Sequence, residues 1–200
     1  MLTEKTLLFA TTNAHKLSEI RQMLPDFNVQ GLRDIHIQDD IPETGFTLEE
    51  NAYLKAKYLF DITGKTSLAE DTGLEVHALD GAPGVHTARF AGDEKDEDKN
   101  MSKLLVLLKN SDNRQAQFRT VIVWIDDKNV HYFEGVVKGI IARVKSGNQG
   151  FGYDPVFIPE GHSLSFADLG TDIKNAISHR AKAIDKLRNF LDVVRSSDQG

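Results

Sequence analysis

The sequence predicts a mixed α/β fold, a sheet flanked by helices that includes one long antiparallel hairpin. Two observations lead to this prediction. In the N-terminal half, short apolar segments alternate with segments of helical periodicity, as in α/β folds. Later, two unusually long β-rich segments, 115–125 and 130–144, are separated only by a short polar turn, which is typical of a hairpin. A purely parallel, doubly wound sheet does not accommodate this hairpin.

The remaining elements follow from apolar runs, capping residues and helix breakers. Asn13 is a predicted N-cap, and Thr47 with Glu50 forms a capping box, so each begins a helix. The predicted strands are 5–10, 67–70 and 74–78, the last two being separated at Asp71–Gly73. A further strand and the segment by which the chain leaves it are predicted over 28–37. The predicted helices are 13–24, 47–62, 96–109 and 173–194, the last with an apolar face at regular helical spacing.

Length and composition exclude several classes of protein. The 200 residues predict a single domain, 1–200, and no apolar run reaches the roughly 20 residues that span a bilayer. The absence of cysteine excludes disulfides and thiolate chemistry, and a cytoplasmic location is expected. A net charge of −6 argues against nucleic-acid binding. An anionic small substrate is still possible, provided that lysines, arginines or a metal ion gather locally.

Gly64–Ser67 looks like the end of a phosphate-binding P-loop, but the rest of that motif is missing. The motif requires a glycine where Leu59 stands, and it requires a loop that leads from a strand into a helix. Here the order is reversed, because a predicted helix precedes Gly64. The P-loop interpretation is therefore rejected.

The segment Thr11–Lys16 follows a predicted strand and opens a predicted helix. Free backbone N–H groups and the helix dipole favour an anion at such a position, and Lys16 lies one turn into the helix. A plain capped helix start with a solvated lysine fits the same residues. Both interpretations stay open at this point.

Two acidic segments are candidates for a metal site. Glu70 and Asp71 are adjacent at a strand end, and side-chain alternation would point them in different directions unless the chain turns there. A carboxylate beside a phosphate site is a natural Mg²⁺ ligand, although a turn aspartate explains Asp71 equally well. Glu43, in a predicted loop, is either a second ligand or a solvated glutamate.

Two C-terminal segments are candidates for binding a flat ligand. In Gly147–Pro155, glycines allow close backbone approach, and Phe151 or Tyr153 could stack on a ring; a tightly turned crossover is the alternative. In Lys174–Arg180, the basic residues lie off the apolar stripe of the last helix, where a solvated basic face is the alternative. The histidines lack the paired spacing of a zinc site.

Taken in order along the chain, the motifs resemble those of one family. They are T-x-N-x-x-K at Thr11–Lys16, EDTGL at Glu70–Leu74, GAPG at Gly81–Gly84, FGYDP at Phe151–Pro155 and KNAISHR at Lys174–Arg180. These motifs and their order resemble those of the inosine/xanthosine triphosphate pyrophosphatase family, which hydrolyses non-standard purine nucleoside triphosphates. The resemblance covers nearly the whole chain. FGYDP and SHR are the most specific of these motifs.

The resemblance implies a fold, an activity and an assembly. The fold would be a mixed α/β domain with a long twisted sheet and two lobes flanking a central cleft. The enzyme would use Mg²⁺ to cleave ITP, dITP or XTP between the α- and β-phosphates, giving the nucleoside monophosphate and pyrophosphate. Such activity cleanses the nucleotide pool and prevents misincorporation into DNA and RNA. Members are usually homodimers, and neither nucleic acid nor a membrane is an expected partner.

The resemblance also implies roles for matching residues. Asp71 would be the catalytic base and a metal ligand, and Glu43 a second metal ligand. The implied substrate-binding residues are Thr11, Thr12, Asn13, Ala14, His15, Lys16, Thr72, Phe151, Gly152, Tyr153, Asp154, Lys174, His179 and Arg180.

The sequence departs from the family pattern at three positions. Thr12 stands where the family often has glycine, so a positive φ there would be strained. Glu70 replaces a common aspartate, and Thr72 replaces a common serine while keeping its hydroxyl.

Two other functions are alternatives to this one. A Maf-like pyrophosphatase acting on modified pyrimidine nucleotides is disfavoured by FGYDP and SHR. A nucleotide-binding regulator without turnover is disfavoured by the intact Lys16 and Asp71.

Overall fold

The computed structural model describes residues 6–38 and 41–197, which form two compact units. Unit 1 contains the described residues up to Asp71 together with 120–135 and those from Ala181 onwards. Unit 2 contains Thr72–Arg119 and Val136–Arg180. The chain divides within three strands, β3 (Ser67–Val76), β5 (Gln115–Ile125) and β6 (Val130–Ile141), so each of these contributes residues to both units.

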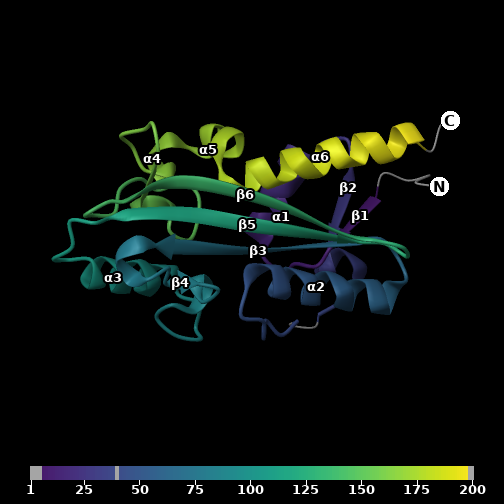
Figure 1. Cartoon of the computed structure of the whole chain (residues 1–200), viewed down its shortest axis with the longest axis horizontal. Coiled ribbons are helices and arrows are strands. Elements are labelled where there is room, and N and C mark those ends of the chain that lie inside the picture. Colours follow the sequence, from purple (N-terminus) through teal and green to yellow (C-terminus); the bar gives the residue numbers. More distant parts are fainter. Residues whose placement is uncertain (1–5, 39–40, 198–200) are drawn as a thin grey trace. The chain divides into compact units, whose positions relative to one another are not determined.

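The strands form a mixed sheet, which confirms the predicted fold class. Their order is β2-β1-β3-β5-β6-β7, and β4 pairs with β3. β1 (Thr6–Phe9) is parallel to both β2 (Asn28–Gly31) and β3, whereas β4 (Pro83–Gly84) and β7 (Phe157–Pro159) are antiparallel to their partners. β5 and β6 form the predicted hairpin, although β6 ends at Ile141 and not at Val144 (Figure 1).

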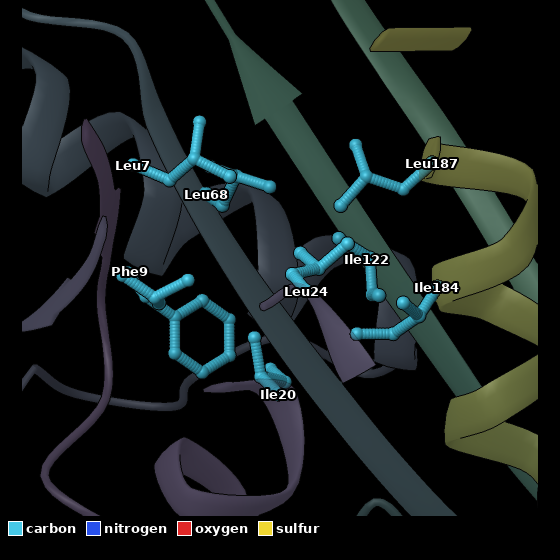
Figure 2. Close-up of a pocket in the computed structure, with 9 residues that line it drawn as sticks. Leu7, Phe9, Ile20, Leu24, Leu68, Ile122, Ile184 and Leu187 are labelled. Carbon is cyan, nitrogen blue, oxygen red and sulfur yellow. The ribbon is translucent and has the colours of Figure 1, made fainter. Parts of the chain in front are cut away.

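Unit 1 has helices on both sides of its strands. In Figure 1, α2 (Leu48–Thr63) lies on one side and α6 (His179–Ser197) on the other. Apolar side chains of α6 and of α1 (Ala14–Met23) pack against strand residues around a small apolar cavity, which Figure 2 shows. The cavity is lined by Leu7, Phe9, Ile20, Leu24, Val29, Leu68, Ile122, Ile184 and Leu187. On α2, the buried face includes two alanines, Ala52 and Ala56, that are fully buried.

Unit 2 repeats this layering around its own core. α3 (Glu97–Leu107) lies on one side of the strands, and the short helices α4 (Phe166–Leu169) and α5 (Thr171–Ile177) lie on the other (Figure 1). The core contains Leu74, Val76, Met101, Leu104, Leu108, Ala116, Phe118, Val137, Ile141, Tyr153, Val156, Phe157 and Phe166. Across residues 6–38 and 41–197, no helix combines the length and apolarity needed to cross a bilayer.

The capping predictions are confirmed in detail. The Asn13 side chain accepts a hydrogen bond from the backbone N–H of Lys16 at 3.1 Å, which begins α1. Thr47 and Glu50 form the reciprocal capping box of α2. Gly64, the residue of the rejected P-loop, ends that helix in the left-handed conformation with φ of 61°. Of the first predicted strand, Lys5 lies outside the described residues.

Besides the end of β6, two predicted boundaries are wrong. β3 runs without interruption through Asp71–Gly73, because alternation places the neighbouring carboxylates of Glu70 and Asp71 beside different lysines and no turn is needed. The last predicted helix is two helices, since Ser178 has an extended backbone (φ −68°, ψ 165°) that ends α5 before α6 begins. The short elements β4, β7 and α4 were not predicted.

We expect the hairpin turn to contribute stability that depends on pH. Asp126 Oδ1 accepts the backbone N–H groups of Lys128 and Asn129, both at 2.8 Å, and Oδ2 accepts Trp124 Nε1–H at 3.3 Å. Partial burial alone would raise the pKa of Asp126, but these hydrogen bonds together outweigh it and hold the pKa below its usual value. Replacing Asp126 by alanine should therefore lower the free energy of unfolding at pH 7 by about 1–2 kcal/mol.

Because the folded-state pKa is the lower one, this contribution is complete above the unfolded-state value of about 4 and is lost as the pH falls through the folded-state value. Urea unfolding of wild type and Asp126→Ala should show their difference shrinking below about pH 4. Asp127→Ala, at an exposed neighbour in the same turn, is the matched control. An equal difference at neutral and acidic pH would contradict the assignment.

Candidate active site

In unit 1, three polar side chains gather around the strand residue Asp71. We call Glu43, Asn51, Lys55 and Asp71 the Asp71 cluster. Lys55 Nζ lies 2.7 Å from Glu43 Oε1 and 3.3 Å from Asp71 Oδ1, so a single ammonium contacts both carboxylates. Asn51 Nδ2–H donates to the other oxygen of Asp71, Oδ2, at 3.2 Å. Asn51 and Lys55 are four residues apart on α2 and therefore share one helix face.

Burial and charge act against each other in this cluster. Burial raises the pKa of Asp71 above its ordinary value, while the charges of Lys55 and Lys16 oppose that rise without cancelling it. For Lys55, burial alone would lower the pKa, but the carboxylates of Asp71 and Glu43 outweigh burial and raise it. Lys55 therefore stays protonated at neutral pH, and Asp71 is a carboxylate of increased basicity.

The donor set of the cluster fits Mg²⁺. This ion is usually held by one or two carboxylates, with waters and substrate phosphates completing its coordination. Glu43 and Asp71 supply two carboxylates that already share one cation, the ammonium of Lys55. Within residues 6–38 and 41–197, no three or more acidic or histidine side chains gather in a way that could hold a metal. The arrangement thus suits an ion shared with a phosphorylated ligand and not an all-protein cage.

The start of α1 provides a second positive group in unit 1. Lys16 Nζ lies 3.1 Å from Glu70 Oε1, and the Glu70 side chain is fully buried. Glu70 and Asp71 thus meet different lysines, which confirms that they point in different directions. Thr12, Asn13, Ala14 and His15 are exposed at the helix N-terminus.

The strain considered for Thr12 does not arise. Outside glycine, the described part of the chain has positive φ only at His36, Asp80 and Lys95. The backbone of Thr12 therefore has a conformation that threonine adopts readily.

In unit 2, a second group of predicted site residues converges around an aromatic ring. We call Phe151, Asp154, Lys174 and Arg180 the Phe151 cluster. Lys174 Nζ lies 2.6 Å from Asp154 Oδ2, which also accepts the backbone N–H of Phe151 at 2.9 Å. The ammonium of Lys174 lies 4.3 Å from the centre of the Phe151 ring, and the Arg180 guanidinium lies 5.7 Å from it. Both distances are within the range of cation–π contacts.

The glycine before Phe151 has a specific structural role. Gly150 has φ of +79°, and a Cβ atom there would lie 2.1 Å from Asp154 Oδ2. Only glycine therefore allows this carboxylate to reach the Phe151 amide and Lys174. The turn is built to hold Asp154, which is 2% exposed.

The predicted substrate-binding residues of this region differ in burial. Tyr153 belongs to the unit 2 core, where its O–H donates to the Thr87 carbonyl at 3.0 Å and burial raises its pKa. Its ring is thus not available for stacking on a ligand, whereas Phe151 is only half-buried. His179 is also buried, and its ring stacks on Phe118 with centres 4.7 Å apart.

The alternative of a solvated basic face in the last helical segment is wrong. Lys174 and His179 are 3% exposed and Arg180 is 1% exposed. Burying three basic side chains is costly unless they have partners, so their placement indicates a built polar site.

The predicted site residues thus form two groups. Unit 1 holds Asp71, Glu43 and the segment Thr11–Lys16, and the Asp71 cluster brings the two carboxylates together. Unit 2 holds Thr72, Gly152, Tyr153, His179 and the Phe151 cluster. A cleft that joins the two groups remains a prediction.

Sequence reasoning missed Asn51 and Lys55. Both are at least nine-tenths buried on α2, next to the buried alanines Ala52 and Ala56. Polar residues within the apolar face of an amphipathic helix are unusual and need partners. That pattern was the available signal, and the predicted helix already contained it.

Comparison with known proteins agrees with this mixed α/β fold. A sequence model of the Ham1 family matches residues 7–190. Curated relatives named dITP/XTP pyrophosphatase include one from Porphyromonas gingivalis, 54% identical over 92% of this chain and 96% of its own. Another, from Flavobacterium johnsoniae, is 47% identical over 94% and 99%. The solved structure of the Staphylococcus aureus Ham1 protein matches with a TM-score of 0.86 and 40% identity, covering 94% of this chain and 98% of that one.

These matches place the fold in a class that includes proteins named dITP/XTP pyrophosphatase. The chain belongs to the Ham1 family. The family prediction made from the motifs is confirmed.

We expect the buried pair in the Phe151 cluster to be strongly coupled. Lys174→Met leaves the Asp154 carboxylate buried without its cation, which should lower the free energy of unfolding by about 3–5 kcal/mol. The double variant Lys174→Met/Asp154→Asn removes both charges and should recover part of this loss. Urea unfolding of both single variants and the double variant measures the coupling. Additive losses would contradict it.

Proposed function

We propose that this chain is a Mg²⁺-dependent nucleoside triphosphate pyrophosphatase that hydrolyses non-standard purine nucleotides, namely ITP, dITP and XTP. The products are the nucleoside monophosphate and pyrophosphate. The observation that carries the proposal is the pair of carboxylates, the buried Asp71 and the partly exposed Glu43, that share the Lys55 ammonium. The family and the named activity of its relatives supply the reaction class. The enzyme would remove these nucleotides before polymerases incorporate them into DNA and RNA.

In this mechanism, the chain supplies positive charge and a base. The α1 N-terminus (Thr11, Thr12, Asn13, Ala14, His15) and Lys16 would bind the phosphates, since a helix N-terminus and an ammonium both attract anions. Glu43 and Asp71 would hold Mg²⁺. When bound, Mg²⁺ neutralises phosphate oxygens and acidifies a nearby water.

Asp71 takes the proton from the attacking water. As water adds to phosphorus, the bond between the α- and β-phosphates breaks and pyrophosphate leaves with the bridging oxygen. Lys55 keeps both carboxylates paired before the metal arrives. Thr72 follows Asp71 directly and would contact the substrate with its hydroxyl.

The Phe151 cluster would read the purine base. Phe151, half-buried beside Gly152, offers a ring for stacking; Asp154 accepts its backbone N–H, and Lys174 lies against its ring. The resemblance also implies Tyr153 and His179 in this region. Hypoxanthine and xanthine carry a carbonyl oxygen at position 6, where adenine carries an amino group. A donor from Arg180 or a loop N–H would pair with that oxygen and would be left without a partner by adenine. Sites that select by hydrogen bonds can discriminate by about 10⁴-fold or more.

We further propose that the protein is a homodimer in the cytoplasm and needs neither nucleic acid nor a membrane as partner. The family resemblance supports the dimer. Cysteine is absent, which suits a reducing compartment.

Replacing Asp71 by asparagine should remove the base and one metal ligand while keeping the side-chain size. We expect kcat for pyrophosphate release from ITP to fall by about 10²- to 10⁴-fold. Chelation of Mg²⁺ by EDTA should abolish the wild-type activity. Asp61→Asn, at an exposed aspartate paired with Lys57, is the matched control and should keep its activity.

The same base predicts the pH dependence. Asp71 must be ionised to accept a proton, and bound Mg²⁺ would acidify the attacking water, so activity should fall at acidic pH and have a neutral-to-alkaline optimum. An activity maximum near pH 5 would contradict this role. Assays with ITP, dTTP and UTP also test the two alternative functions. A preference for the pyrimidine nucleotides would favour a Maf-like enzyme. Nucleotide binding without turnover would favour a regulator.

Arg180→Ala should narrow the preference for ITP over ATP by about 10- to 100-fold, because an unmatched buried donor costs roughly 1–3 kcal/mol. The measurement is kcat/KM for each nucleotide. Arg180→Lys, which keeps the charge but loses the planar fork, guards against misfolding in the alanine variant. Lys182→Ala, at an exposed lysine of the same helix, is the control. Lower turnover with an unchanged ITP to ATP ratio would refute the role.

A further inference from the structure

We infer that Asn51 is a positioning residue that fixes the two carboxylates of the Asp71 cluster for metal binding. The inference rests on the proposed function, and it concerns a residue that the sequence motifs do not include. Asn51 is 2% exposed, and its side chain accepts one hydrogen bond and donates another. Each bond reaches a segment that carries one of the proposed metal ligands.

The first bond holds the loop that carries Glu43. Asn51 Oδ1 accepts the backbone N–H of Gly45, two residues after Glu43, at 2.8 Å. The loop is pressed against the helix, since a Cβ at Gly45 would lie 2.6 Å from Glu50 Cβ and 2.8 Å from Asn51 Oδ1. Next to it, the Phe46 N–H donates to Glu50 Oε2 at 2.6 Å. The loop therefore has fixed backbone geometry immediately after Glu43.

The second bond restricts the rotation of Asp71. Asn51 Nδ2–H donates to Oδ2 at 3.2 Å, while Lys55 Nζ contacts Oδ1 at 3.3 Å. With a donor on each oxygen, the plane of the carboxylate is determined. A carboxamide is suited to this double role because it carries an acceptor and a donor on one carbon, so it can bind an amide N–H and a carboxylate together.

Residues that orient metal ligands affect metal affinity without touching the metal. Without Asn51, the Glu43 loop and the Asp71 carboxylate would each be free to move, and ordering them would oppose metal binding. Lys55 alone does not replace this function, because it contacts the carboxylates but not the loop backbone.

The test uses Mn²⁺ as probe, with binding to the full-length protein followed by electron paramagnetic resonance in the absence of nucleotide. Asn51→Ala should bind Mn²⁺ about 10-fold or more weakly than wild type, the range typical for residues behind metal ligands. Hydrogen exchange at the Gly45 amide should accelerate. The pyrophosphatase activity of Asn51→Ala should recover when Mg²⁺ is raised, which a simple loss of folded protein would not show.

Asn100→Ala is the matched control. Asn100 is equally buried on α3 of unit 2, where its Oδ1 accepts Ala91 N–H at 2.6 Å and its Nδ2 donates to the Ala88 carbonyl at 2.9 Å. The substitution should cost similar stability and leave Mn²⁺ affinity unchanged. If Asn51→Ala does not fold, Gly45→Ala carries the test, because its Cβ would force the loop away from Asn51 and should also weaken Mn²⁺ binding.

Glu43→Gln and Asp71→Asn test the metal site independently of the role of Asn51. Both should weaken Mn²⁺ binding if the metal site is correct. Mn²⁺ affinity of Asn51→Ala within twofold of wild type, with both ligand variants weakened, would overturn the inference about Asn51 alone. Unchanged affinity in the ligand variants would overturn the metal site, and the inference with it.

Discussion

The candidate site of unit 1 depends on one ammonium group shared by two carboxylates. Lys55 compensates the negative charge of Glu43 and Asp71 at a position where water cannot do so fully. Without that charge, the buried Asp71 and the partly exposed Glu43 would repel each other, which favours protonation of one of them, as in two acids that share a site. The lysine thus preserves the ionised state that a catalytic base and a metal ligand both require. It also means that a metal ion must compete with, or displace, a cation that is already present.

Strand geometry directs two neighbouring acidic residues of β3, Glu70 and Asp71, to different partners. Alternation directs Glu70 to Lys16 at the start of α1 and Asp71 to Lys55 on α2. Two neighbouring carboxylates therefore hold two lysines from different helices, and the strand fixes the distance between them. In unit 2, the Asp154 carboxylate has a comparable task, because it receives Lys174 and the backbone amide of Phe151.

The sequence was informative where the signal is local. The caps at Asn13 and Thr47, the β5–β6 hairpin and the family motifs all depend on residues close together in the chain, and each was predicted. The break at Ser178 was missed because the apolar spacing continues on both sides of it, and only the backbone dihedrals reveal the interruption.

The missed site residues depend on distant parts of the chain. Asn51 and Lys55 acquire their meaning from β3, some 15 to 20 residues further along, and from the loop that precedes α2. No periodicity reports such contacts. The predicted turn at Asp71 failed for a related reason, since the lysines that allow two adjacent acids in a continuous strand lie on other elements.

The small side chains on the inner face of α2 have a consequence for natural variation. Ala52 and Ala56 are wholly enclosed, so a bulkier residue at either position would have to push the helix outward. Asn51 and Lys55 lie on the same helix and would move with it. Their hydrogen bonds to Asp71 would lose most of their strength if the distance between donor and acceptor grew by about an ångström. Natural variants with a larger residue at either position would therefore lose activity although every polar residue of the candidate site is unchanged.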